Sequence, residues 1–252
     1  MSIINQEKTW RLIPLISASG EVQMAIDNWL LKQHLQGNHP PTLRFYTWNP
    51  GAISLGYHQQ DYPQFWQQLH LDIPLDIVRR PTGGKAVLHQ GDLTYGVITS
   101  AVAGKRWEVY KYICQFLIEG WRSLGVNLQY GNTNKQYANY HNCFATATSA
   151  DLITENGKKA IGSAQLRRRN AILQHGSMNL QDNHHLFIKI FNEPPPQNLR
   201  SFIPSSENKT IVKIAETLTE AAKDWFKINI VLQPLSKEEW QDILNNHVSV
   251  RY

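Results

Sequence analysis

The chain has 252 residues, of which 42% are hydrophobic and 18% charged, and its formal net charge is +5. This composition excludes a disordered or fibrous protein, and the length fits one large domain or two small ones. No apolar stretch approaches the roughly 20 residues that cross a bilayer, and residues 10–17 lack the layout of a signal peptide. The sequence therefore predicts a cytoplasmic protein that does not enter a membrane.

The modest positive charge is spread along the chain and favours a solvated basic surface, with steering of an acidic protein partner as the alternative. Nucleic acid is not an expected partner, because the chain has no basic–aromatic repeat or nucleic-acid-binding motif. The two cysteines are too few for a disulfide framework and have no metal-ligand spacing. We therefore expect no metal site.

The first part of the chain predicts strands around one helix. Residues 10–17 are apolar and predict a strand. Residues 21–35 place apolar side chains at helical spacing and predict an amphipathic helix. Residues 42–48 alternate as a strand does, and residues 52–56 predict the next strand after the turn residues Asn49-Pro50-Gly51.

The middle of the chain continues with short elements and then a long helix. A short helical stretch is expected at residues 62–70, followed by strands at 76–80, 86–88 and 93–99. Residues 106–124 give the clearest helix, because apolar residues from Trp107 to Leu124 form one stripe and Gly125 follows them.

The last part predicts strands and then helices. Strands are expected at residues 151–155, 159–164 and 171–180, with Asn156-Gly157 as a hairpin turn. The three prolines at 194–196 are the best candidate for a boundary or a stiff connection. Helices follow at about 209–226 and from Ser236, where Ser236 and Glu239 have the spacing of a capping box.

Short turns as well as helices join these strands, and the regular βαβ alternation of a doubly wound sheet is absent. The pattern predicts an α+β fold, with a mixed, mostly antiparallel sheet packed against helices.

The segment from Arg79 to His89 is a candidate ligand-binding loop. Its paired glycines, Gly83 and Gly84, let the main chain turn sharply and approach a ligand closely. Successive N–H groups there can hold an anion or a carbonyl oxygen, and the flanking cations, such as Lys85, add positive charge. The alternative is an ordinary Gly-Gly hairpin with exposed cations.

Two strand segments carry polar residues with chemical potential. Lys159 leads into a predicted strand and can point its ammonium into a pocket, where it would stabilise negative charge on a carbonyl oxygen; an exposed turn lysine is the alternative. In Leu173-Gln174-His175-Gly176-Ser177, polar residues interrupt an apolar strand and can face a cleft. For His175 the alternative is a satisfied core histidine.

The two cysteines lie in contrasting contexts. Cys143 follows His141-Asn142 in a segment with no helical or strand periodicity, so it is a candidate nucleophile with a lowered pKa. Cys114 lies on the apolar stripe of the strongest helix. We expect Cys114 to be buried and inert.

These segments, in this order, resemble the superfamily of lipoate–protein ligases, octanoyltransferases and biotin–protein ligases. The resemblance covers nearly the whole chain. It rests on Pro41 to Trp48 with Ser54-Leu55-Gly56-Tyr57, Arg79 to His89 with Asp92-Leu93-Thr94-Tyr95, Gly157 to Gln165, and Leu173 to Ser177. It implies one catalytic domain over residues 1–252, with a helical C-terminal part from about residue 197, a central sheet, and an acyl-chain pocket beside the Gly-Gly loop.

Within the superfamily, the chain most resembles the cysteine-dependent octanoyltransferases. It has Gly83-Gly84-Lys85 where adenylating lipoate ligases usually have three glycines, and it has a Cys143-Phe144 pair upstream of the lysine block. The chain continues only a short way past Ser236, so we expect no accessory domain like that of many adenylating ligases. A biotin ligase is disfavoured because its Gly-Arg-Gly-Arg type of loop is missing.

The resemblance implies Cys143 as the nucleophile and Lys159 as the active-site lysine that contacts the acyl carbonyl. The residues that it implies for acyl or substrate binding are Arg80, Thr82, Gly83, Gly84, Lys85, His89, Gly162, Ser163, Ala164, His175 and Gly176.

The implied reaction moves an octanoyl or lipoyl group from acyl carrier protein, through a cysteine thioester, to the lysine of a lipoyl domain. The expected acceptors are the glycine cleavage H protein and the E2 subunit of 2-oxoacid dehydrogenases. This reaction requires no cofactor. Three alternatives remain: an ATP- and Mg-dependent lipoate–protein ligase, a lipoyl amidotransferase, and a non-catalytic protein that binds acyl groups or lipoyl domains.

Overall fold

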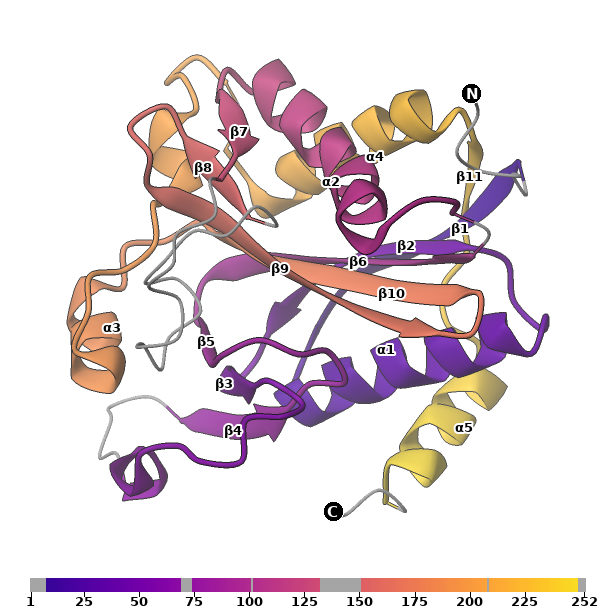
Figure 1. Ribbon diagram of the computed structural model, residues 1–252, viewed down its shortest axis with the longest axis horizontal. Coiled ribbons are helices and arrows are strands. Elements are labelled where there is room, and N and C mark those ends of the chain that lie inside the picture. The colour runs from indigo at the N-terminus through magenta and orange to yellow at the C-terminus, as the bar shows by residue number, and fades with distance from the viewer. Residues whose placement is uncertain (1–7, 69–73, 101, 132–150, 208, 249–252) are drawn as a thin grey trace.

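The computed structural model describes residues 8–68, 74–100, 102–131, 151–207 and 209–248. Eight strands form one sheet in the order β11-β1-β2-β6-β10-β9-β8-β7, and three more form a small sheet in the order β4-β3-β5 (Figure 1). Most neighbouring strands are antiparallel, while β1 runs parallel to β2 and β11, and β3 runs parallel to β4. The predicted α+β class and the mixed, mostly antiparallel sheet are confirmed.

The strands lie close to the predicted positions. Their bounds are β1 Thr9–Ala18, β2 Thr42–Trp48, β3 Gly51–Leu55, β4 Leu75–Arg79, β5 Val87–His89, β6 Asp92–Ser100, β7 Leu128–Tyr130, β8 Leu152–Thr154, β9 Lys159–Arg168, β10 Ala171–Asn179 and β11 Asn229–Leu232. The sequence did not predict β7 and β11, which are only three and four residues long. Strands this short show little alternation of their own, and β8, which is equally short, could be predicted because the turn Asn156-Gly157 follows it.

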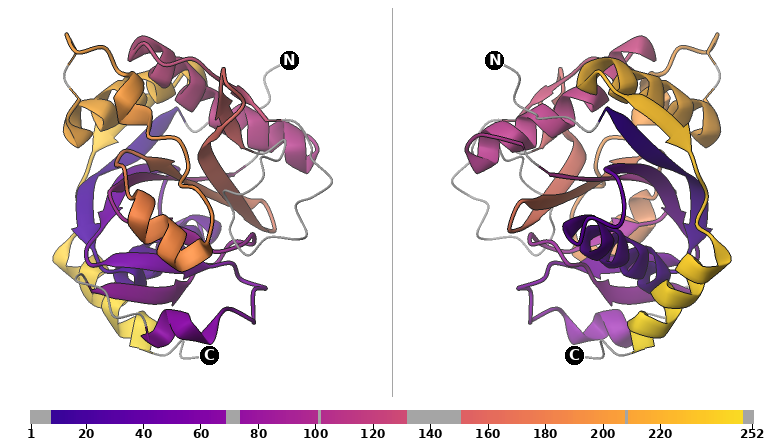
Figure 2. Two further views of the ribbon diagram at one scale, coloured as in Figure 1. Left: turned by 90° about the vertical axis from the view of Figure 1, so that its left-hand side faces the viewer. Right: turned by 90° about the vertical axis from the view of Figure 1, so that its right-hand side faces the viewer.

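The helices are α1 Gly20–Leu35, α2 Arg106–Ser123, α3 His184–Phe191, α4 Ile211–Phe226 and α5 Lys237–Val248, with short 3-10 helices at Gln64–Gln68 and Leu199–Phe202. Helices α2 and α4 cover one face of the large sheet, and α1 covers the other with α5 beside it (Figures 1 and 2). No helix in the described ranges is long and apolar enough to cross a membrane.

Two helix predictions need correction. The predicted helix at 62–70 is a five-residue 3-10 helix, in which Trp66 is buried and Phe65 is exposed; residues 69–73 lie outside the described ranges. Trp107, predicted to lie on the buried stripe of α2, is 54% exposed. It occupies the first turn of the helix, where the ammonium of Lys111 lies 5.4 Å from the centre of its ring.

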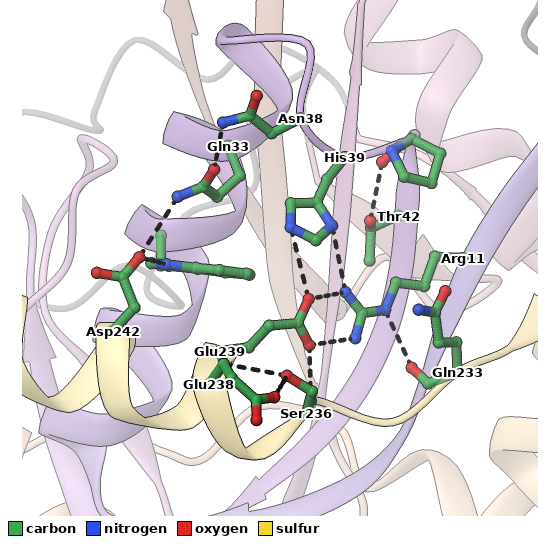
Figure 3. Close-up of polar contacts among 12 residues, drawn as sticks. Arg11, Gln33, Asn38, His39, Thr42, Gln233, Ser236, Glu238, Glu239 and Asp242 are labelled. Atoms are coloured by element: carbon green, nitrogen blue, oxygen red, sulfur yellow. Dashed lines mark hydrogen bonds and ion pairs between the residues drawn. The ribbon is translucent and has the colours of Figure 1, made fainter.

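A buried ion pair joins the C-terminal helix to the start of the large sheet. Arg11 on β1 is 1% exposed and donates two hydrogen bonds of 2.7 Å to the carboxylate of Glu239 on α5 (Figure 3). The predicted capping box of α5 is also present, because Ser236 Oγ accepts from the Glu239 N–H and Glu239 Oε2 accepts from the Ser236 N–H. Trp29 of α1 donates to Asp242, so α5 is tied to two other elements.

We expect Glu239→Ala to lower the free energy of unfolding by about 3 kcal/mol, because it leaves a buried guanidinium without its charged partner. Urea unfolding would measure the loss. Glu238→Ala, one residue away and exposed, should cost less than about 1 kcal/mol. Equal losses in the two variants would show that the Arg11 pair does not hold α5.

Candidate active site

A pocket lies where β9 and β10 of the large sheet meet the small sheet and α1. Its cavity volume is about 30 Å³, and it opens to solvent. Seven of the residues predicted for substrate binding line it: Arg80, His89, Gly162, Ser163, Ala164, His175 and Gly176. Met24, Trp48 and Val87 give the pocket apolar walls. A larger and more open groove, between α4 and β1, contains none of the predicted site residues.

The Gly-Gly loop is held by Arg80, which is 5% exposed. The Arg80 guanidinium donates to the main-chain oxygens of Ser54, Gly83 and Lys85 at 2.7–2.8 Å. Gly84 has a φ of +98°, which favours glycine, and a Cβ on Gly56 would lie only 1.8 Å from the Gly84 oxygen. The paired glycines therefore allow a close packing of main chain, and Arg80 fixes the loop from within.

A first buried polar chain connects α1 to the Gly-Gly loop. Thr82 Oγ1 lies 2.6 Å from His175 Nε2, and His175 Nδ1 lies 2.8 Å from Asp27 Oδ2. Asp27 also pairs with Arg44 at 3.1 Å and accepts a hydrogen bond from Tyr46. With Nδ1–H donated to the carboxylate, Nε2 of His175 accepts a hydrogen bond from the Thr82 hydroxyl. The chain thereby fixes both the ring of His175 and the start of the loop.

A second chain of the same type also reaches the pocket, through His89. His89 Nδ1 lies 2.8 Å from Asp92 Oδ2, and His89 Nε2 lies 2.8 Å from Ser54 Oγ. The ring of His89 stacks on Trp48 at 3.8 Å between centroids, and Ser177 and Thr94 donate to Asp92 Oδ2. Two Asp–His–hydroxyl chains therefore frame the pocket.

Burial lowers the pKa of His89 below its usual 6.5, and the charge and hydrogen bond of Asp92 offset this only in part. The folded protein then resists protonation of His89 while the unfolded chain protonates near pH 6.5. The free energy of unfolding is therefore not reduced by His89 above pH 6.5, and it falls as the pH drops below that value. For this one group the loss is at most about 1.4 kcal/mol per pH unit. His39 acts in the same direction, because burial lowers its pKa too.

We expect the free energy of unfolding to fall between pH 7 and pH 5.5 in wild type, and to fall less steeply in His89→Gln. Urea titrations across this range would measure both slopes. If the two proteins lost stability in parallel, His89 would not be a source of the pH dependence.

Lys159 begins β9, three residues before the pocket wall at Gly162. It is 5% exposed, and its ammonium forms an ion pair of 3.0 Å with Asp151, which is also buried. Lys159 is not among the residues that line the pocket. The structure therefore shows a buried lysine three residues from the pocket along β9, and excludes the alternative of an exposed turn lysine.

Of the two cysteines, only Cys114 lies within the described residues. Cys143 lies outside the described residues. Cys114 is fully buried on α2, and burial raises the pKa of its thiol to about 12. It accepts a hydrogen bond from Gln174 at 3.2 Å. The prediction that Cys114 is buried is confirmed, and a thiol with this pKa is not ionised at neutral pH.

Gly176 packs tightly inside the pocket wall. A Cβ at this position would lie 2.5 Å from Ser163 Oγ and 2.6 Å from a ring carbon of Tyr95. Tyr95 donates to Ser163 Oγ at 2.9 Å, which fixes the hydroxyl at this distance. Gly176 is therefore required for the close packing of β10 against β9 and β6, rather than for a turn.

Three buried carboxylates that bond the site residues were not predicted from the sequence to have a role in the site. Asp27, Asp92 and Asp151 are all buried, and each bonds a predicted site residue, namely His175, His89 and Lys159 in that order. Asp27 had a detectable signal, because it lies among apolar residues of the predicted helix at 21–35. Asp92 and Asp151 lie at strand ends, where an acidic residue is ordinary.

Comparison with known proteins shows the family to which the chain belongs. The profile of the family described as "Lipoyl protein ligase A/B catalytic domain" matches residues 19–233. A protein named octanoyltransferase LipM from Bacillus subtilis (strain 168) is 33% identical, covering 98% of this chain and 96% of its own. A LipM from Anoxybacillus flavithermus is 34% identical, covering 88% of this chain and 85% of its own.

Solved structures share the fold. Lipoate-protein ligase A bound with ATP superposes with a TM-score of 0.78 at 18% identity, covering 96% of this chain and 94% of that one. A bi-partite lipoate protein ligase from Thermoplasma acidophilum gives 0.73 at 18% identity, covering 96% and 93%. With a family profile that spans most of its length and relatives that match it nearly end to end, the chain belongs to the lipoyl protein ligase A/B catalytic domain family.

Proposed function

We propose that this protein transfers an octanoyl group from acyl carrier protein to the lysine of a lipoyl domain, through a thioester on Cys143. The observation that carries the proposal is the full-length similarity to relatives named octanoyltransferase, at 33–34% identity. The pocket supports it, because part of its lining is apolar, as an acyl chain requires, and the Gly-Gly loop is joined to it through Thr82 and His175. The enzyme would work in the cytoplasm, where its carrier and acceptor proteins occur.

The first step is an exchange of thioesters. The Cys143 thiolate attacks the octanoyl carbonyl, a carbon–sulfur bond forms to the enzyme, and the bond to the carrier sulfur breaks. The departing carrier thiolate takes up the proton that Cys143 lost. A free thiol with a pKa of about 8.5 is only a few per cent ionised at neutral pH, so Lys159, if it approaches Cys143, would favour the thiolate.

The second step forms the amide. The neutral amine of the acceptor lysine attacks the enzyme thioester, the carbon–nitrogen bond forms, and the Cys143 thiolate leaves. The nitrogen loses one proton in the process, which returns the thiol to its resting form. In both steps a negative charge develops on the carbonyl oxygen, and the ammonium of Lys159 with the N–H groups of Gly83 and Gly84 would stabilise it.

No cofactor enters these steps. ATP and Mg would be needed only by the alternative, an adenylating lipoate ligase, for which the ATP-bound structure of a protein with this fold is the specific observation. Its 18% identity supports the fold and not the reaction, so we place the ligase second. The acceptors in our proposal are lipoyl domains, namely the H protein or E2.

The test is transfer in a purified system. Octanoyl carrier protein and an apo lipoyl domain should give octanoylated lipoyl domain without ATP, detected by intact mass. Octanoate or lipoate with ATP and Mg should give little product and little pyrophosphate. Product that requires ATP would establish the ligase instead, product only from a lipoylated H protein would establish an amidotransferase, and binding without product from any donor would establish a non-catalytic protein.

A further inference from the structure

A cluster of five cations lies at the end of the strands that form the pocket. It consists of Lys105, Arg106, Arg167, Arg168 and Arg169, and is called here the basic cluster. Three of these residues lie at the turn between β9 and β10, and two lie at the start of α2. The register of β10 on β6 pairs Ala171 with Ser100, which brings the hairpin turn beside the segment leading to α2 (Figure 1). All are exposed except Arg167, which is half-buried.

These charges have no carboxylate partner among the residues that the structure describes. Over the described ranges, none of the five forms an ion pair. The nearest carboxylate at the start of α2, Glu108, accepts the main-chain N–H of Lys105 as a helix cap. Arg167 donates to Gln165 but has a buried Nη2 without a hydrogen-bond partner. Burial and the charge of Arg106 lower the pKa of Arg167, so the cations repel one another.

An accessible side of β9 joins the basic cluster to the pocket. Strand β8 pairs with β9 no further than Ile161, so within the described part of the chain the edge of β9 from Gly162 onward has no neighbouring strand. Residues Ser163 to Arg167 are half-buried, whereas the facing residues of β10 are fully buried. Ser163 lines the pocket, and Arg168 lies five residues further along. At about 3.3 Å per residue, the distance is about 17 Å.

We propose that the basic cluster is the docking surface for the acidic carrier protein that delivers the acyl group, with the carrier's flexible arm lying along β9 into the pocket. The proposal rests on the proposed function and adds the place where the donor binds. An acidic surface would neutralise the unpaired cations, and a positive surface next to a pocket speeds the encounter with such a partner.

Distance favours the donor over the acceptor as the occupant. A carrier protein holds its acyl thioester at the end of a long prosthetic arm, so its body can bind at the basic cluster, about 17 Å along β9 from Ser163 in the pocket. A lipoyl domain offers a single lysine side chain, which is much shorter than that. The acceptor must therefore bind directly at the mouth of the pocket, and the basic cluster is available to bind the donor.

The test compares two double variants with the same change of charge. Arg106→Glu/Arg168→Glu reverses two charges of the basic cluster, and a glutamate at the start of α2 also suits the helix dipole. Lys237→Glu/Lys213→Glu is the matched control, because Lys237 is the first residue of α5 and both lysines are exposed. Each variant is assayed with octanoyl carrier protein and with the small thioester octanoyl-N-acetylcysteamine as donors. The concentration of the lipoyl domain is also varied, to give its KM.

We expect the cluster variant to lower kcat/KM for octanoyl carrier protein about ten-fold or more at low salt, with the difference shrinking as salt is added. Turnover of the small thioester and the KM for the lipoyl domain should not change, and the control should behave as wild type. Fluorescence anisotropy of labelled carrier protein would report the same loss as binding.

Three results would overturn the proposal: an equal loss in the control variant, an equal loss with the small thioester, or a raised KM for the lipoyl domain alone. Failure of the proposed function has a different signature, because wild type would then turn over neither octanoyl donor. In that case the anisotropy measurement still tests the docking surface: if the cluster variant bound carrier protein as tightly as wild type, the docking proposal would be rejected too.

Discussion

Lys159→Met should slow octanoyl transfer to the Cys143 thiol by about 100- to 1,000-fold, the loss typical when one donor to a developing oxyanion is removed. The ammonium is buried and is held 3.0 Å from Asp151, so it is fixed before the substrate arrives. A single-turnover assay with octanoyl carrier protein would measure the rate of acyl-enzyme formation.

This substitution also affects folding, and a second variant separates the two effects. Removing one partner of a buried ion pair costs about 3–5 kcal/mol, so Lys159→Met alone should be less stable. The double variant Lys159→Met/Asp151→Asn leaves no charge buried and should recover most of that stability without recovering activity. A stable double variant that formed the acyl-enzyme at the wild-type rate would show that Lys159 stabilises the fold and has no role in catalysis.

Asp27→Ala should lower the free energy of unfolding by about 3–5 kcal/mol, out of the roughly 5–15 kcal/mol of a typical domain. Asp27 and Arg44 are both 0% exposed, so the substitution leaves a fully buried guanidinium without its counter-charge. It also removes the partner of His175 Nδ1, and with it the restraint on Thr82. Urea unfolding would measure the stability, and KM for the octanoyl donor would report the loosened loop.

Tyr46→Phe is the matched control for this network. It removes one hydrogen bond to Asp27 but keeps the ion pair, so we expect a loss of only about 1 kcal/mol. If Tyr46→Phe were as damaging as Asp27→Ala, packing around the ring rather than the charge network would hold this side of the pocket.

Much of the fold could be predicted because its strands and helices are long enough to show their periods. The apolar stripe of α2 and the alternation of β2 are local properties. The same is true of the capping box of α5, where Ser236 and Glu239 are three residues apart. By contrast, β11 is a short strand that pairs with β1 across more than 200 residues, and nothing in its own sequence specifies that partner.

In the site, too, local features could be predicted and long-range contacts could not. The segments around Gly83, Gly162 and His175 could be identified because each is a compact block of glycine and polar residues. Their carboxylate partners could not, because Asp27 reaches His175 across 148 positions, and contact over such a separation depends on the packing of α1 against the sheet. The basic cluster was missed for the same reason, since it unites the start of α2 with a hairpin turn 60 residues later.

Trapping of the acyl-enzyme tests the central claim most directly. Wild type and Cys114→Ala, mixed with octanoyl carrier protein and no acceptor, should each gain the mass of one octanoyl group, mapped to the peptide that contains Cys143. Cys143→Ala should gain none. An octanoyl group that still appears on Cys143→Ala, or a wild type that octanoylates the lipoyl domain without ever carrying the group itself, would contradict transfer through this thiol.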